Sequence, residues 1–196
     1  MLEHINGVIF DLDGTLVDSQ LDFAAIRRET GFPEDEGLLE HLETLQDPAL
    51  KARAEAIIVR HEMEGALAAS WMPGAQDLLQ RLVLANYPVG IVTRNNRVAA
   101  RQMLDTLDIP CDMLVAREDA PAKPHPGGLL AIAGRWELAP ERLVYVGDYI
   151  FDLQAANNAG MLACWYDVGR GFSYAEQADL VVRHFDELAD SLFTGK

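Results

Sequence analysis

Two aspartates separated by one residue follow a short apolar segment near the N-terminus. Val8, Ile9 and Phe10 are expected to form a buried strand that runs directly into Asp11 and Asp13. Because side chains alternate along an extended chain, both carboxylates would project to the same side. Like charges held that close are unfavourable unless a cation lies between them or one carboxyl keeps its proton. The pair could therefore serve as a metal site or as an acid–base group.

Other candidate residues stand at similar positions further along the chain. Thr93 ends an apolar segment over 89–93, and Asp148 follows another over 143–146. Only three lysines occur, at positions 51, 123 and 196. Lys123 therefore carries more weight as a site residue than a lysine in a more basic chain would.

The elements that would position these residues alternate between helix and strand after residue 73. Strands are predicted over 8–10, 89–93, 113–115, 143–146, 162–165 and 180–182, and helices over 77–85, 98–107, 126–136, 153–158 and 185–192. This order is typical of the α/β class, in a Rossmann-like three-layer α/β/α arrangement with a parallel sheet. Such sheets bind ligands beyond the carboxyl ends of their strands. Asp11, Asp13, Thr93 and Asp148 are therefore expected to meet in one crevice.

Residues 19–71 follow a different pattern, in which apolar residues recur at helical spacing and no convincing strand occurs. Helices are predicted over 21–30, 38–45 and 47–68. We therefore expect a catalytic core made of residues 1–16 and 73–196, with a small inserted helical cap over 17–72.

Composition narrows the function classes. The formal charge of −15, from 31 acidic and 16 basic residues, argues against binding to nucleic acid or to an anionic membrane. No segment approaches the ~18 consecutive apolar residues of a membrane span, and no secretory signal pattern opens the chain. Cys111 and Cys164 have no metal-ligand spacing and are expected to be buried free thiols. A cytoplasmic protein is expected.

Four short motifs occur in order along the chain. They are Asp-x-Asp-Gly-Thr over 11–15, Thr93, Lys123 with Pro124, and Gly-Asp-x-x-x-Asp over 147–152. In this order and strand context, the sequence resembles the haloacid dehalogenase-like hydrolase superfamily, specifically its phosphoglycolate phosphatase-like members with a helical cap after the first strand. The resemblance covers nearly the whole chain.

The resemblance implies a phosphoric monoester hydrolase, or phosphatase, with two aspartates in different roles. Asp11 would be the nucleophile and would form an aspartyl-phosphate. Asp13 would protonate the leaving alcohol and then deprotonate water, with its proton retained through crowding by Asp11 and partial burial. Dehalogenases of the superfamily do not carry aspartate at the position of Asp13, so halide displacement is not expected.

The resemblance also implies a cofactor and a set of binding residues. Mg²⁺ would be held by Asp11, the backbone carbonyl of Asp13, Asp148 and Asp152. Thr93 and the backbone amide of Arg94 would hold phosphoryl oxygens, and Lys123 would neutralise charge there. Arg94, Asn95, Arg27 and Arg28 are candidates for contacting the rest of a small phosphorylated metabolite.

Several alternatives stay open at this stage. A sugar phosphomutase would use the same four motifs, and a phosphoaspartate receiver, a signalling switch, also combines aspartate, threonine and lysine on a parallel sheet. Thr93 could instead cap the helix that follows it. The substrate could be phosphoglycolate or a sugar phosphate, although a cap over 17–72 is short for phosphoglycolate phosphatases. The sequence leaves both monomer and homodimer open.

Overall fold

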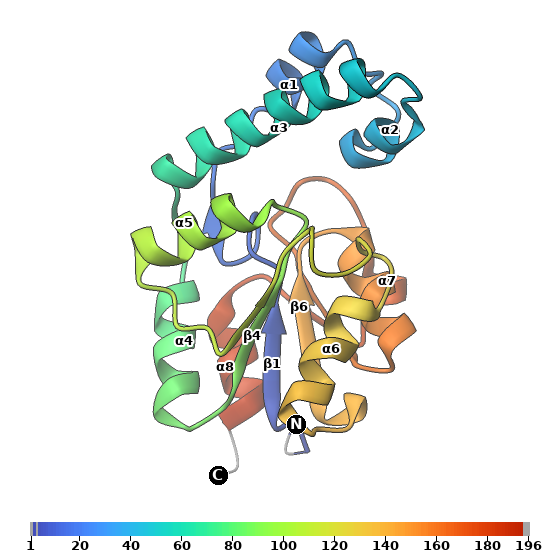
Figure 1. The fold of residues 1–196 in the computed structure, drawn as a ribbon. Helices are drawn as coiled ribbons and strands as arrows, with labels where there is room; N and C mark the ends of the chain where they lie inside the picture. The colour runs from blue at the N-terminus through green and yellow to red at the C-terminus, as the bar shows by residue number, and fades with distance from the viewer. Residues whose placement is uncertain (1, 3, 194–196) are drawn as a thin grey trace.

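A parallel sheet of six strands positions the candidate residues (Figure 1). The computed structural model describes residue 2 and residues 4–193. The strand order is β5-β4-β1-β6-β7-β8. The strands are β1 (Gly7–Phe10), β4 (Val89–Val92), β5 (Met113–Val115), β6 (Leu143–Gly147), β7 (Leu162–Tyr166) and β8 (Leu180–Val182). The predicted α/β three-layer class is confirmed.

Register explains why the candidate residues converge. Phe10, the last residue of β1, pairs with Ile91 of β4 on one side and with Val146 of β6 on the other. The residues that follow these strands therefore leave the sheet at one edge, with β1 in the middle.

Two layers of helices cover the sheet. One face is buried by α4 (Ala75–Leu84), α5 (Arg97–Leu107) and α8 (Phe185–Phe193), and the other by α6 (Gly127–Trp136) and α7 (Ile150–Ala159), as Figure 1 shows. Helix α7 begins three residues before the predicted start at 153. The Asp152 carboxylate accepts a hydrogen bond from the Tyr149 amide and so extends the helix toward the sheet edge.

Three helices lie over the carboxyl edge of the sheet, between β1 and α4 in the sequence (Figure 1). They are α1 (Phe23–Thr30), α2 (Leu38–Thr44) and α3 (Pro48–Ala68). They have an apolar cluster of their own, built on Ile26, Phe32, Leu38, Leu42, Ala54 and Ile58. We call α1–α3 the helical insertion.

A two-stranded antiparallel ladder joins the helical insertion to the sheet domain. It consists of β2 (Val17–Asp18) and β3 (Ser70–Trp71). The expectation of no strand between 19 and 71 was wrong for β3, because two paired residues leave no periodic pattern in the sequence. Within the described part of the chain, no helix has the length and apolar character needed to cross a bilayer, and both cysteines are free.

Candidate active site

A cavity of about 620 Å³ lies between the carboxyl edge of the sheet and the helical insertion. Of the residues predicted from the sequence, the lining includes Asp11, Asp13, Arg27, Arg94, Asn95, Lys123, Asp148 and Asp152. Thr93 and Arg28 are not part of the lining. One cavity therefore brings together most of the predicted site.

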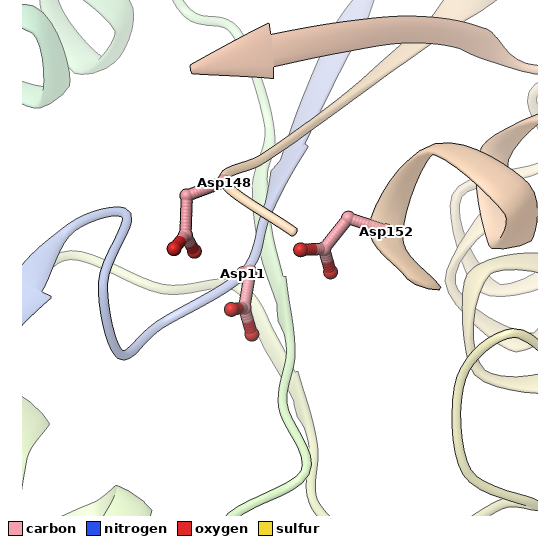
Figure 2. A group of neighbouring side chains, drawn as sticks. All are labelled: Asp11, Asp148 and Asp152. Atoms are coloured by element: carbon pink, nitrogen blue, oxygen red, sulfur yellow. The ribbon is translucent and has the colours of Figure 1, made fainter. Parts of the chain in front are cut away.

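Three carboxylates meet at the base of the cavity. Asp11 follows β1, Asp148 follows β6 and Asp152 lies in the first turn of α7, and Figure 2 shows the three side chains around a common space. One oxygen from each lies within 4.8 Å of the others. Such a set of oxygen ligands suits Mg²⁺. We call Asp11, Asp148 and Asp152 the acidic trio.

Burial and mutual repulsion raise the free energy of the ionised acidic trio. Burial raises the pKa of Asp11 to about 8, with the neighbouring Lys123 opposing and the charges of Asp152 and Asp148 adding to the shift. Burial also raises the pKa of Asp148 to about 6, again assisted by the charge of Asp152. A cation bound between these carboxylates would relieve that cost.

Lys123 is the buried cation beside the acidic trio. Its Nζ donates to Asp11 at 2.7 Å, to Asp152 at 2.6 Å and to the Tyr145 hydroxyl at 2.9 Å. Burial works against the charged form, but Asp11 and Asp152 outweigh it, so the pKa of Lys123 is raised. The lysine is therefore held charged, with its position fixed by three acceptors.

Asp13 lies apart from the acidic trio although it lines the same cavity. Its carboxylate accepts a hydrogen bond from the Ser19 amide at 3.1 Å. Burial is the main cause of its raised pKa, which the Ser19 contacts oppose. Crowding by Asp11, expected from the sequence, is not the main cause. Strand β1 ends at Phe10 and the chain bends at Leu12, so the two aspartates do not share an extended segment.

The loop after β4 contains a buried side-chain donor without a hydrogen-bond partner among the described residues. Thr93 Oγ1 donates to Asn95 Oδ1 at 3.2 Å, and the backbone amide of Asn95 donates back to Thr93 Oγ1. Asn95 Nδ2 is buried and has no hydrogen-bond partner among the described residues. The alternative that Thr93 caps α5 is wrong, because Asn96 accepts the capping bond from Ala99 at 2.9 Å.

The two arginines predicted on α1 lie in different surroundings. Arg27 lines the cavity, but its guanidinium donates to the carbonyls of Pro33 and Glu36 and so closes the loop between α1 and α2. Arg28 is exposed and lies outside the lining. Adjacent residues of a helix point about 100° apart, which explains why only one of them faces the cavity. The structure therefore places Arg27, and not Arg28, in the cavity lining.

Two further groups contact Asp148 and were not singled out from the sequence. Thr15 Oγ1 donates to its carboxylate at 3.0 Å, and the Arg170 guanidinium forms an ion pair with it. Arg170 stands between Gly169 and Gly171, both with positive φ. An arginine between two glycines, in a chain with so few basic residues, could have drawn attention to this position in the sequence.

A second group of residues that was not singled out from the sequence joins the helical insertion to the loop after β4. Glu62, buried on α3, accepts from Arg117 at 2.7 Å and from the amide side chain of Asn96. Arg94, in the same loop, pairs with Glu40 of α2 and lies over the Phe151 ring at 5.1 Å. These ion pairs hold the insertion against the cavity. Glu62 gave no signal in the sequence because it stands in an ordinary helical stretch.

Comparison with known proteins gives consistent matches. A family model described as haloacid dehalogenase-like hydrolase matches residues 8–166. A haloacid dehalogenase-like hydrolase domain-containing protein of Arabidopsis thaliana is 30% identical over 175 residues, covering 83% of this chain and 71% of that protein. The phosphoglycolate phosphatase of Escherichia coli O157:H7 is 30% identical over 220 residues, covering 91% of this chain and 86% of that enzyme. In fold, the chain is similar to a predicted phosphoglycolate phosphatase from Haemophilus somnus 129PT, with a TM-score of 0.78, 20% identity and coverage of 96% and 98%.

Proposed function

The chain belongs to the haloacid dehalogenase-like hydrolase family, and on this basis we propose that it is a Mg²⁺-dependent phosphatase acting on a small phosphomonoester. The observation that carries the proposal is the position of Asp11. Its buried carboxylate stands at the base of a cavity, 2.7 Å from the Lys123 ammonium and beside two further carboxylates. A nucleophile, a fixed cation and a set of metal ligands are thus within reach of one bound phosphoryl group.

In the proposed first step, an Asp11 oxygen attacks phosphorus and the bond from phosphorus to the alcohol oxygen breaks. The electron pair leaves with the alcohol oxygen, which takes a proton from Asp13. The raised pKa of Asp13 supports this role, because the acid must keep its proton until the alcohol departs. The product of this step is an aspartyl-phosphate on Asp11.

In the second step, Asp13 takes a proton from a water molecule that attacks phosphorus, and the Asp11 oxygen departs as a carboxylate. Lys123 neutralises charge on the phosphoryl oxygens in both steps. Asn95, which belongs to the cavity lining, would be a further contact for those oxygens. The acidic trio and the Asp13 carbonyl would hold Mg²⁺, which supplies charge neutralisation at the phosphoryl group.

The proposal is tested by phosphate release from a panel of phosphomonoesters that includes phosphoglycolate and sugar phosphates. Wild type and Asp11→Asn are compared with and without Mg²⁺. We expect release only when both Mg²⁺ and Asp11 are present. An isomerised sugar phosphate without free phosphate would instead identify a phosphomutase. A long-lived phosphoaspartate with negligible phosphate release would identify a switch of the receiver type.

A further inference from the structure

Exposed aromatic rings gather on the cavity lining. Phe23 of α1, Tyr149 before α7 and Phe172 after β7 are 55%, 45% and 58% exposed, and all three line the cavity. Large apolar side chains that remain this accessible on a concave surface mark a place where a ligand covers them. On this basis, and resting on the proposed phosphatase activity, we propose that the substrate is a phosphomonoester whose leaving alcohol carries a flat aromatic ring.

Four aromatic rings on the sheet side form a connected set, and three of them, Phe172, Tyr149 and Phe151, line the cavity. Phe172 stacks on Tyr174 with an interplanar angle of 7°, and Tyr174 meets Tyr149 edge to face. Tyr149 in turn meets Phe151 edge to face at 5.3 Å. We call these four residues the aromatic wall. Because each ring is held by its neighbour, a substrate ring could pack on the wall with little ordering of side chains.

The charged groups of the lining argue against an acidic leaving group. Arg27 is bound to two backbone carbonyls, Arg94 to Glu40 and Arg170 to Asp148. Lys123 is bound to Asp11 and Asp152. Among the described lining residues, every arginine and lysine is thus already engaged. A carboxylate on the leaving group would have to share one of these cations with its present partner, whereas a ring would cover surface that is now exposed.

The size of the cavity agrees with a larger substrate than phosphoglycolate. Its volume of about 620 Å³ falls within the roughly 300–1,000 Å³ typical of pockets for drug-sized ligands. Apolar residues of the insertion, Leu21, Ile26, Leu38, Leu39 and Ile58, also contribute to its lining. A ring of the leaving alcohol would have room between the insertion and the aromatic wall.

The test compares primary-alcohol phosphates with matched chemistry at the phosphorus. We would measure kcat/KM, with Mg²⁺, for ethyl phosphate, 2-cyclohexylethyl phosphate, 2-phenylethyl phosphate and phosphoglycolate. The leaving oxygen is similar in the first three, so differences among them report binding of the group beyond it. We expect 2-phenylethyl phosphate to exceed ethyl phosphate by about tenfold or more and to exceed the cyclohexyl ester. We expect phosphoglycolate to gain nothing over ethyl phosphate.

Variants test two aromatic residues of the cavity lining, Phe172 of the aromatic wall and Phe23 of the helical insertion. In Phe172→Leu and Phe23→Leu, the ratio of kcat/KM for 2-phenylethyl phosphate to that for ethyl phosphate should fall severalfold. Leu84, 83% exposed on α4 and outside the cavity lining, offers the control, and Leu84→Ala should leave the ratio unchanged.

Each outcome bears either on the aromatic substrate alone or on the phosphatase activity as well. Turnover of ethyl phosphate or phosphoglycolate without a gain from the ring would overturn the inference and leave the phosphatase proposal standing. A preference for phosphoglycolate, or an equal gain from the cyclohexyl ring, would do the same. Failure of every ester, including the sugar phosphates of the earlier panel, would overturn the phosphatase proposal and this inference with it.

Discussion

Replacing Asp11 by asparagine should stabilise the metal-free protein, and more so as pH rises. Burial raises the pKa of Asp11 from 3.8 to about 8 in the folded protein. The folded state therefore keeps a proton that the unfolded state releases, and the stability associated with that proton is present below about pH 4. It is lost as pH rises toward 8. Asparagine keeps the shape and can accept from Lys123, but it has no proton to lose.

The magnitude follows from the linkage between proton binding and folding. While the folded protein retains one more proton than the unfolded chain, each unit of pH increase lowers the free energy of unfolding by about 1.4 kcal/mol. Between about pH 5 and pH 7, the free energy of unfolding of wild type should thus fall by about 3 kcal/mol relative to that of Asp11→Asn. Asp148 is present in both proteins, so its own titration largely cancels from the difference.

The assay is urea unfolding with a metal chelator, at several pH values between about 5 and 8. Asp105→Asn is the matched control, because Asp105 is an exposed aspartate of α5 outside the acidic trio, and the Asp11→Asn difference is compared with it at each pH. A difference between wild type and Asp11→Asn that stays flat over this range would refute the reasoning. It would mean that Asp11 is ionised in the folded protein without a metal.

Three other substitutions test the contacts around the cavity. Lys123→Met should lower kcat by about 10²–10³, because the phosphoryl oxygens lose a fixed cation; a loss under tenfold would contradict that role. Glu62→Gln should destabilise the protein by about 3 kcal/mol in urea unfolding and raise KM, because the half-buried Arg117 loses its buried carboxylate partner; an unchanged KM would separate the insertion from substrate binding. Arg170→Ala should tighten Mg²⁺ binding about fivefold in calorimetry, since an ion pair with an exposed arginine, worth about 1 kcal/mol, no longer competes for Asp148; weaker binding would assign Arg170 a supporting role.

The sheet and the base of the site could be predicted because they follow from local patterns. Alternating strands and helices predict a parallel sheet, and a parallel sheet brings the residues after its strands to one edge. Asp11 and Asp148 were placed correctly by that rule alone. Lys123 follows no strand of the sheet, and its motif and the scarcity of lysines drew attention to it.

The contacts made by the helical insertion could not be predicted in the same way. Glu62 of α3 meets Arg117, which follows β5, only because the helical insertion packs over the carboxyl edge of the sheet, and nothing in the local sequence of either residue specifies that packing. Two neighbouring arginines of α1 show the same limit of prediction from the sequence. Arg27 and Arg28 are equivalent in the sequence, yet the rotation of α1 sends one toward the cavity and the other to the surface. Side-chain direction depends on docking, which residue spacing does not encode.

The most direct test of the central claim is detection of a phosphoryl group on Asp11. In Asp13→Asn with Mg²⁺ and para-nitrophenyl phosphate, the leaving group needs no acid, whereas hydrolysis of the aspartyl-phosphate lacks its base. The account predicts that acid-quenched Asp13→Asn carries a phosphoryl group on the peptide containing Asp11, at a higher level than wild type. Phosphate release by wild type with no phosphorylated Asp11 in either protein would contradict the account.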